Sequence, residues 1–131
     1  KEEKKEEKKE DEITEEILDK LNSVAYIVSN EVLEWDLKKT MDKIQERKRK
    51  KENFDELEDR KQQLELKMQL LVVQIQTEQL SFEAYTAMVQ KKIDEERVWA
   101  NKLVKTHKDE ARLALTRARL MENELAAEDE E

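Results

Sequence analysis

Hydrophobic residues recur every three or four positions between residues 30 and 126, with polar residues between them. This spacing places the hydrophobic side chains on one face of a helix, so it predicts a series of amphipathic helices. Residues that commonly cap helix N-termini stand at three of the expected starts, namely Asn30, Asn53 and Ser81. The predicted helices span residues 30–50, 54–79, 82–105 and 107–126.

The hydrophobic stripe of the helix predicted at 54–79 is unusually wide. A two-stranded coiled coil needs about two hydrophobic positions in seven, and this segment has at least three. The additional residues are Leu66, Leu70 and Val73. A stripe of this width favours a helix that packs on two neighbours.

Two architectures fit the middle of the chain. A turn at Gln79–Ser81 would fold the helices into antiparallel hairpins, as a small helical bundle or coiled coil. However, one heptad register continues from Leu57 to Trp99 without a break at Ser81, as in one continuous coiled-coil rod from about residue 54 to residue 105. Such a rod would be about 78 Å long. Polar residues at register positions 61, 78, 92 and 96 weaken it.

The ends of the chain differ from residues 30–127, which form the predicted helical module. Residues 1–12 repeat Lys and Glu with like charges four apart, which predicts a solvated linker of fluctuating helicity. Residues 13–29 are predicted to form a short apolar helix or an extended packed strap. Residues 128–131 are all acidic and lie at the end of a helix where negative charge is unfavourable, so this tail is expected to fray.

Composition supports the all-α prediction. The chain has no glycine and no proline among 131 residues, and 46% of its residues are charged. Long helices and coiled coils have this composition, because they need few sharp turns. The absence of cysteine excludes disulfides and is compatible with a cytoplasmic location. No apolar run approaches the roughly 20 residues of a transmembrane helix.

Catalysis is not expected from this sequence. The only histidine, His107, lies in a charged run, and the pattern Glu-x-x-His is absent because Val104 stands three residues before it. The carboxylates follow exposed helix faces, whereas catalytic acids need burial or like-charged neighbours to shift their pKa. We therefore predict a protein with no catalytic residue, no metal site and no cofactor.

One basic run stands out, and it consists of Arg47, Lys48, Arg49, Lys50 and Lys51. Positive charge at a helix C-terminus is favourable, so a solvated helix end explains this run. The same charge can also attract an anionic lipid surface. Nucleic acid is a less favoured partner, because the run has no interleaved aromatic residues and the chain carries a net charge of −8.

The expected partners are other protein helices, in the same chain, in a second copy or in a different subunit. The candidate contact residues are the large side chains of the hydrophobic stripes. Trp35 and Trp99 belong to them, although burial within the fold is the default expectation for each. The complete set is Leu33, Trp35, Leu37, Leu57, Leu64, Met68, Leu71, Ile75, Tyr85, Trp99 and Leu103.

Three stretches together resemble the C-terminal helical tail of the coiled-coil and C2-domain proteins of the Lethal giant discs type. They are EVLEWDL at 31–37, QIQTEQLSFEAYTAMVQKK at 74–92 and ALTRARLMENEL at 114–125. The family has glycine near the turn, where this chain has Glu78-Gln79. The resemblance implies a cytoplasmic, non-enzymatic adaptor that works near membranes.

Two functions follow from these patterns. The first is a non-enzymatic protein–protein interaction module, serving as an adaptor or scaffold segment of a larger cytoplasmic protein. The second is a coiled-coil spacer in a cytoskeletal or ciliary (axonemal) assembly. The two functions predict different lengths for the segment from residue 54 to residue 105, because a long spacer needs a continuous rod.

Overall fold

The computed structural model describes the backbone of residues 2–129 and the side chains of residues 10–127. Within this part of the chain every regular element is a helix, which confirms the all-α prediction. The elements are α1 (Glu2–Asn22), the short 3-10 helix η1 (Val24–Tyr26), α2 (Asn30–Lys50), α3 (Asp55–Gln76), α4 (Phe82–Leu103) and α5 (Lys108–Asp129).

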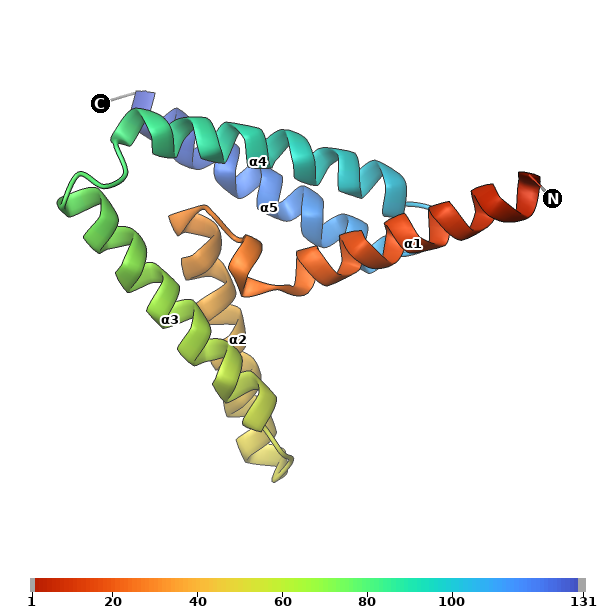
Figure 1. The fold of residues 1–131 in the computed structure, drawn as a ribbon. Helices are drawn as coiled ribbons and strands as arrows, with labels where there is room; N and C mark the ends of the chain where they lie inside the picture. The colour runs from red at the N-terminus through yellow and green to blue at the C-terminus, as the bar shows by residue number, and fades with distance from the viewer. Residues whose placement is uncertain (1, 130–131) are drawn as a thin grey trace.

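The helices form two antiparallel hairpins that point in different directions (Figure 1). Helices α4 and α5 lie along each other, and we call this pair the body. Helices α2 and α3 form the second pair, the arm, which projects away from the body and ends in a tip at residues 51–54. The last turns of α1 pack on the body, and α2 contacts α5 where the arm joins it.

The continuous rod is wrong, because the chain leaves the helical path between Gln76 and Phe82. The turn lies where the hairpin alternative placed it, but α3 and α4 diverge from it instead of packing side by side (Figure 1). Each of these two stripes is covered by another helix of the same chain, α2 for α3 and α5 for α4. The unbroken heptad register therefore reflects two separate hairpins.

The turn at the arm tip and the turn between α3 and α4 are both made without glycine. Each contains a residue whose backbone is in the left-handed, positive-φ region. Lys51 follows α2 with φ 57°, and its N–H is donated to the carbonyls of Arg47 and Lys48. Glu78 follows α3 with φ 61°. Residues with a Cβ atom adopt this region at a cost of about 1–2 kcal/mol. The packing of the helices on either side of each turn offsets this conformational cost.

Helix caps agree with the sequence at one position and differ at two. The cap position of α3 is Phe54, one residue after the predicted Asn53, although the Asn53 side chain still accepts from the N–H of Asp55 at 2.8 Å. Ser81 caps α4 as predicted, since its hydroxyl accepts from the N–H of Ala84 at 3.1 Å. The cap of α2 is Ser29, one residue before the predicted Asn30; its hydroxyl accepts from the N–H of Val32. Both are good capping residues, and the contact that selects Ser29 comes from α5, as described below.

The core consists of two clusters. One joins η1, the arm, α4 and the C-terminal half of α5, and includes Val32, Leu33, Leu64, Val89 and Met121. The other seats α1 on the body through Ile17, Leu21, Trp99, Leu103 and Ala114.

The N-terminal segments take the following form. The charged segment predicted as a linker, residues 1–12, is helical from Glu2 onward, and its fluctuation stays a prediction. Residues 13–29 were predicted to form either a short helix or an extended strap, and both occur. The segment is helical up to Asn22 and continues as a packed strap around η1. The side chains of the acidic tail lie outside the described residues.

Candidate interaction surface

The most exposed hydrophobic side chains of the arm lie on one side of α3. Leu66 is 67% exposed, Leu70 54% and Val73 49%, whereas Leu64 and Leu71 on the opposite side are buried against α2 and the body. Positions 66, 70 and 73 follow each other at helical spacing and therefore share one face. We call this the outer face of α3; its remaining members are Gln62, Gln63, Gln69, Gln76 and Thr77, all exposed.

The outer face contains no charged residue over the four turns from Gln62 to Thr77, in a chain of which 46% is charged; the exposed Asp59 lies on the same face one turn nearer the tip. Isolated exposed hydrophobic residues are common on protein surfaces, but a continuous apolar and uncharged stripe is typical of a contact site. The sequence pattern predicted that α3 packs on two neighbours. Within the described residues α3 has two neighbours, α2 and η1, as predicted, and neither of them covers the outer face.

A groove of about 410 Å³ lies where the arm meets the body, beside the C-terminal end of α3. Its walls include Val72, Ile75 and Phe82, and Glu124 of α5 lies among its lining residues. Phe82 is 57% exposed. The groove therefore extends the hydrophobic surface of α3 around to the start of α4.

Glu124 joins the arm to the body at this groove. One carboxylate oxygen accepts from the Ser29 hydroxyl at 2.9 Å and from the N–H of Glu31 at 3.0 Å. The other accepts from the Tyr85 hydroxyl at 2.5 Å, and that hydroxyl oxygen in turn accepts from the N–H of Asn30 at 2.9 Å. A carboxylate satisfies the free N–H groups and the positive dipole of a helix N-terminus, so Glu124 holds the start of α2.

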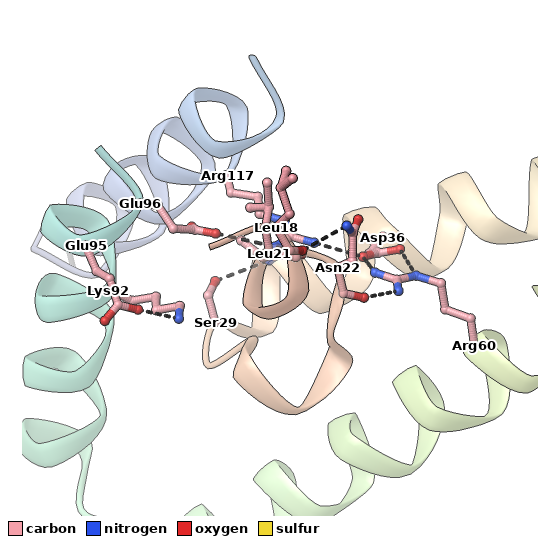
Figure 2. A network of polar contacts seen from close by, with 11 residues as sticks. Leu18, Leu21, Asn22, Ser29, Asp36, Arg60, Lys92, Glu95, Glu96 and Arg117 are labelled. Carbon is pink, nitrogen blue, oxygen red and sulfur yellow. Dashed lines mark hydrogen bonds and ion pairs between the residues drawn. The ribbon is translucent and has the colours of Figure 1, made fainter. Parts of the chain in front are cut away.

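A second polar network crosses the interior, as Figure 2 shows. Arg60 of α3 donates Nη2 to Asp36 of α2 at 2.6 Å and Nε at 3.1 Å. Arg117 of α5 lies between that aspartate and Glu96 of α4, 3.4 Å from an oxygen of each. Asp36, Glu96 and Arg117 are all at most 5% exposed. The network thus links four helices through three buried charges and the half-buried Arg60.

The same arginines hold the end of α1. Arg117 Nη1 donates to the carbonyl of Leu21 and Arg60 Nη1 to the carbonyl of Asn22, both at 2.8 Å. The last carbonyls of a helix lack intrahelical partners and carry partial negative charge, so cations favour this position. α1, the arm and the body are therefore fixed at one point (Figure 2).

The two buried carboxyl groups are shifted in opposite directions. Burial opposes ionisation of Asp36, but the hydrogen bond and charge of Arg60, with Arg117, outweigh it and hold its pKa below the usual value of 3.8. Burial raises the pKa of Glu96 to about 7, although Arg117 and Lys92 nearby favour its charged form. Arg117 Nε is buried without a partner in the described part of the chain. Asp36 is consequently the main counter-ion of the two arginines.

The basic run at the arm tip is solvent-exposed throughout, from Arg47 to Lys51. Arg47 donates to the carbonyl of Asn53 at 3.0 Å, Lys48 lies 5.2 Å from the ring centre of Phe54, and Lys50 pairs with Glu46 at 3.2 Å. These contacts are local to the tip. Arg49 and Lys51 are exposed, and contact of the run with an anionic surface stays a prediction.

The predicted partner-contact residues do not form one surface. Most of them face helices of the same chain, and Ile75 alone among them is exposed, at 38%. The buried ones are Leu33, Leu64, Leu71, Tyr85, Trp99 and Leu103, and the half-buried ones are Trp35, Leu37, Leu57 and Met68. The outer face of α3 consists instead of the residues that had widened the predicted stripe.

Neither a metal site nor a membrane-spanning helix is found in the part of the chain that the structure describes. No group of three or more His, Cys, Asp or Glu side chains among these residues is placed to hold a metal ion. None of the described helices combines the length and apolar character needed to cross a bilayer. His107 is half-buried and contacts only its neighbour Thr106 in the hydrogen bonds of its side chain.

Comparisons of the chain with protein-family models, with curated proteins and with solved structures gave no match.

The buried network was not identified from the sequence, although it left a signal there. Arg117 stands on the same helix face as Ala114, Ala118 and Met121, so a charged residue occupies a hydrophobic position. Glu96 likewise occupies a hydrophobic position of the heptad register, and from the sequence alone it serves only as an argument against a continuous rod. A charge on a hydrophobic stripe indicates either exposure of that stripe or a buried ion pair, and the sequence alone does not distinguish them.

Proposed function

We propose that this chain is a non-enzymatic helical interaction module whose binding surface is the outer face of α3. The observation that carries the proposal is the exposure of Leu66, Leu70 and Val73 on a helix whose other side is packed. A helix pair that two polar networks anchor to the body, at Glu124 and at Asp36, presents this face as a fixed platform, which reduces the ordering cost of binding. An amphipathic helix of a partner fits such a stripe through residues spaced three and four apart.

The resemblance to the tail of Lethal giant discs-type proteins supports an adaptor role in the cytoplasm, near membranes. The spacer function required a continuous rod between residues 54 and 105, and that length is absent from a chain that turns at Thr77–Ser81. We therefore propose the adaptor function only.

The test is a capture experiment with the purified chain and cytosolic extract. The double variant Leu66→Gln/Leu70→Gln should lose proteins that the native chain retains, since hydrophobic residues at the centre of an interface supply most of its affinity. The matched control is Leu115→Gln, which alters a side chain of 52% exposure on α5. Equal ellipticity at 222 nm verifies folding. Identical capture by all three proteins would refute the proposed surface.

A further inference from the structure

We propose that the outer face of α3 pairs with the same face of a second copy, antiparallel, around a twofold axis near Leu70. This inference rests on the proposed function, because it specifies the partner of that same surface. Three features of the described residues support it: the lack of charge on the face, the position of the basic tip and the symmetry of the hydrophobic triplet.

The lack of charge distinguishes a second copy from other partners. Around a twofold axis each residue meets its own equivalent or a near neighbour, so a face with one sign of charge would repel itself. The outer face carries only Leu, Val, Gln and Thr between Gln62 and Thr77. A partner of different sequence is commonly selected by complementary charges, and this face offers none. Its glutamines can instead form hydrogen bonds with one another across the seam.

The basic tip sets the direction of the pair. In a parallel pair the two runs from Arg47 to Lys51 would lie beside each other, and ten like charges would face one another across the axis. In an antiparallel pair about an axis at Leu70, the two copies of Asp55, where each α3 begins next to its tip, are about 45 Å apart. Each α3 then extends past the partner's Gln76 by about 13 Å, because α3 runs about 22 Å from Leu70 to Asp55 but only about 9 Å from Leu70 to Gln76. The turn that contains Glu78 follows Gln76, at the end of α3 that the partner's tip passes.

The triplet fits this arrangement. Leu66 and Val73 lie on either side of Leu70, so in the antiparallel pair each Leu66 approaches Val73 of the other copy and the two Leu70 side chains meet at the axis. The seam from Gln62 to Thr77 is only about 22 Å long. Interfaces this small are at the weak end of specific association, so the dimer should depend strongly on concentration.

Cysteine cross-linking tests the geometry directly, because the native chain has no cysteine. Leu70→Cys should give a covalent dimer with a short bis-maleimide reagent. Gln62→Cys should not, since its two copies would be about 24 Å apart along the axis. Leu115→Cys, exposed on α5, measures random collision. Equal yields for Leu70→Cys and Leu115→Cys would overturn the proposal, and a strong yield for Gln62→Cys would overturn the antiparallel direction.

Sedimentation equilibrium of the native chain provides a measurement that needs no cysteine. The mass should rise from 15.7 kDa toward twice that value with concentration, and Leu66→Gln/Leu70→Gln should stay monomeric. A native chain that remains monomeric at millimolar concentration would refute the second copy as partner. If that monomer still loses captured proteins in the double variant, the proposed function stands and only this inference fails.

Discussion

Arg60 and Asp36 form a two-point ion pair between the helices of the arm, with Nη2–Oδ2 at 2.6 Å and Nε–Oδ1 at 3.1 Å. The aspartate is 5% exposed and also lies 3.4 Å from Arg117, so one carboxylate balances two guanidinium groups. The Thr40 hydroxyl, 3.2 Å from Oδ1, completes its surroundings. Asp36 therefore connects both helices of the arm to α5 of the body.

Removing that carboxylate should destabilise the protein strongly. We expect Asp36→Ala to lower the free energy of unfolding by about 3–5 kcal/mol, because Arg117 would remain buried without its main counter-ion. Arg60 is itself partly exposed, but its loss leaves the buried Asp36 carboxylate with Arg117 as its remaining cation, so Arg60→Ala should cost about 1–3 kcal/mol, less than Asp36→Ala. Urea unfolding followed at 222 nm measures both. Asp42→Ala, at an exposed position of the same helix, is the control. A loss below 1 kcal/mol for Asp36→Ala would contradict this role.

The two left-handed turn residues predict a stabilising substitution. Glu78→Gly should raise the free energy of unfolding by up to about 1 kcal/mol, because glycine adopts φ 61° without a Cβ clash. The gain is limited by the larger entropy of glycine in the unfolded chain. Gln79→Gly is the matched control, since position 79 does not have positive φ and glycine brings only the entropic cost there. If both variants lost stability equally, the turn would not have the described conformation.

Tyr85 and Glu124 should be energetically coupled through the start of α2. Tyr85→Phe removes the hydroxyl between Glu124 and the Asn30 N–H, and we expect it to cost about 1–2 kcal/mol. Glu124→Gln weakens the same cap, so the double variant should lose less than the sum of the single losses. Tyr26→Phe controls for the loss of a tyrosine hydroxyl at a residue that is 46% exposed. Additive losses would show that the two side chains act independently.

The sequence predicted the helices more accurately than their pairing. The helix expected at 30–50 has those bounds, and the one expected at 82–105 ends at Leu103. Periodicity is a local property that shows which face is covered but not by which helix, so the heptad register could not separate a rod from two hairpins. The cap of α2 was displaced by one residue for a similar reason. Ser29 and Asn30 are both suitable caps, and Glu124, 95 residues from Ser29, selects between them.

The candidate surface was partly predictable. The width of the stripe on 54–79 predicted two packing neighbours, and α2 and η1 are these neighbours. Leu66, Leu70 and Val73, which made the stripe wide, are exposed instead. The buried network was not predictable, because it depends on where Asp36, Glu96 and Arg117 meet in space. Their separation in sequence, 21 residues or more, leaves no local pattern that would connect them.

Glu96 should make stability depend on pH near neutrality. Its pKa is raised from 4.5 to about 7, so the folded state binds a proton more tightly than the unfolded state. The contribution of Glu96 to the free energy of unfolding should therefore be greatest below about pH 4.5. It should fall as the pH rises to about 7, by up to roughly 3 kcal/mol in total. The pKa of Asp36 is lowered, so its contribution is lost only below its usual 3.8 and outside this window.

Glu96→Gln tests this directly, because a neutral isostere cannot titrate. The variant should be less dependent on pH between 5 and 7.5 than the native chain, and at pH 7.5 it should be the more stable of the two. Asp94→Asn, at an exposed position of the same helix, should retain the native slope. Urea unfolding at a series of pH values gives each slope. Parallel slopes for the native chain and Glu96→Gln would mean that the carboxyl is hydrated or ionised in the folded protein.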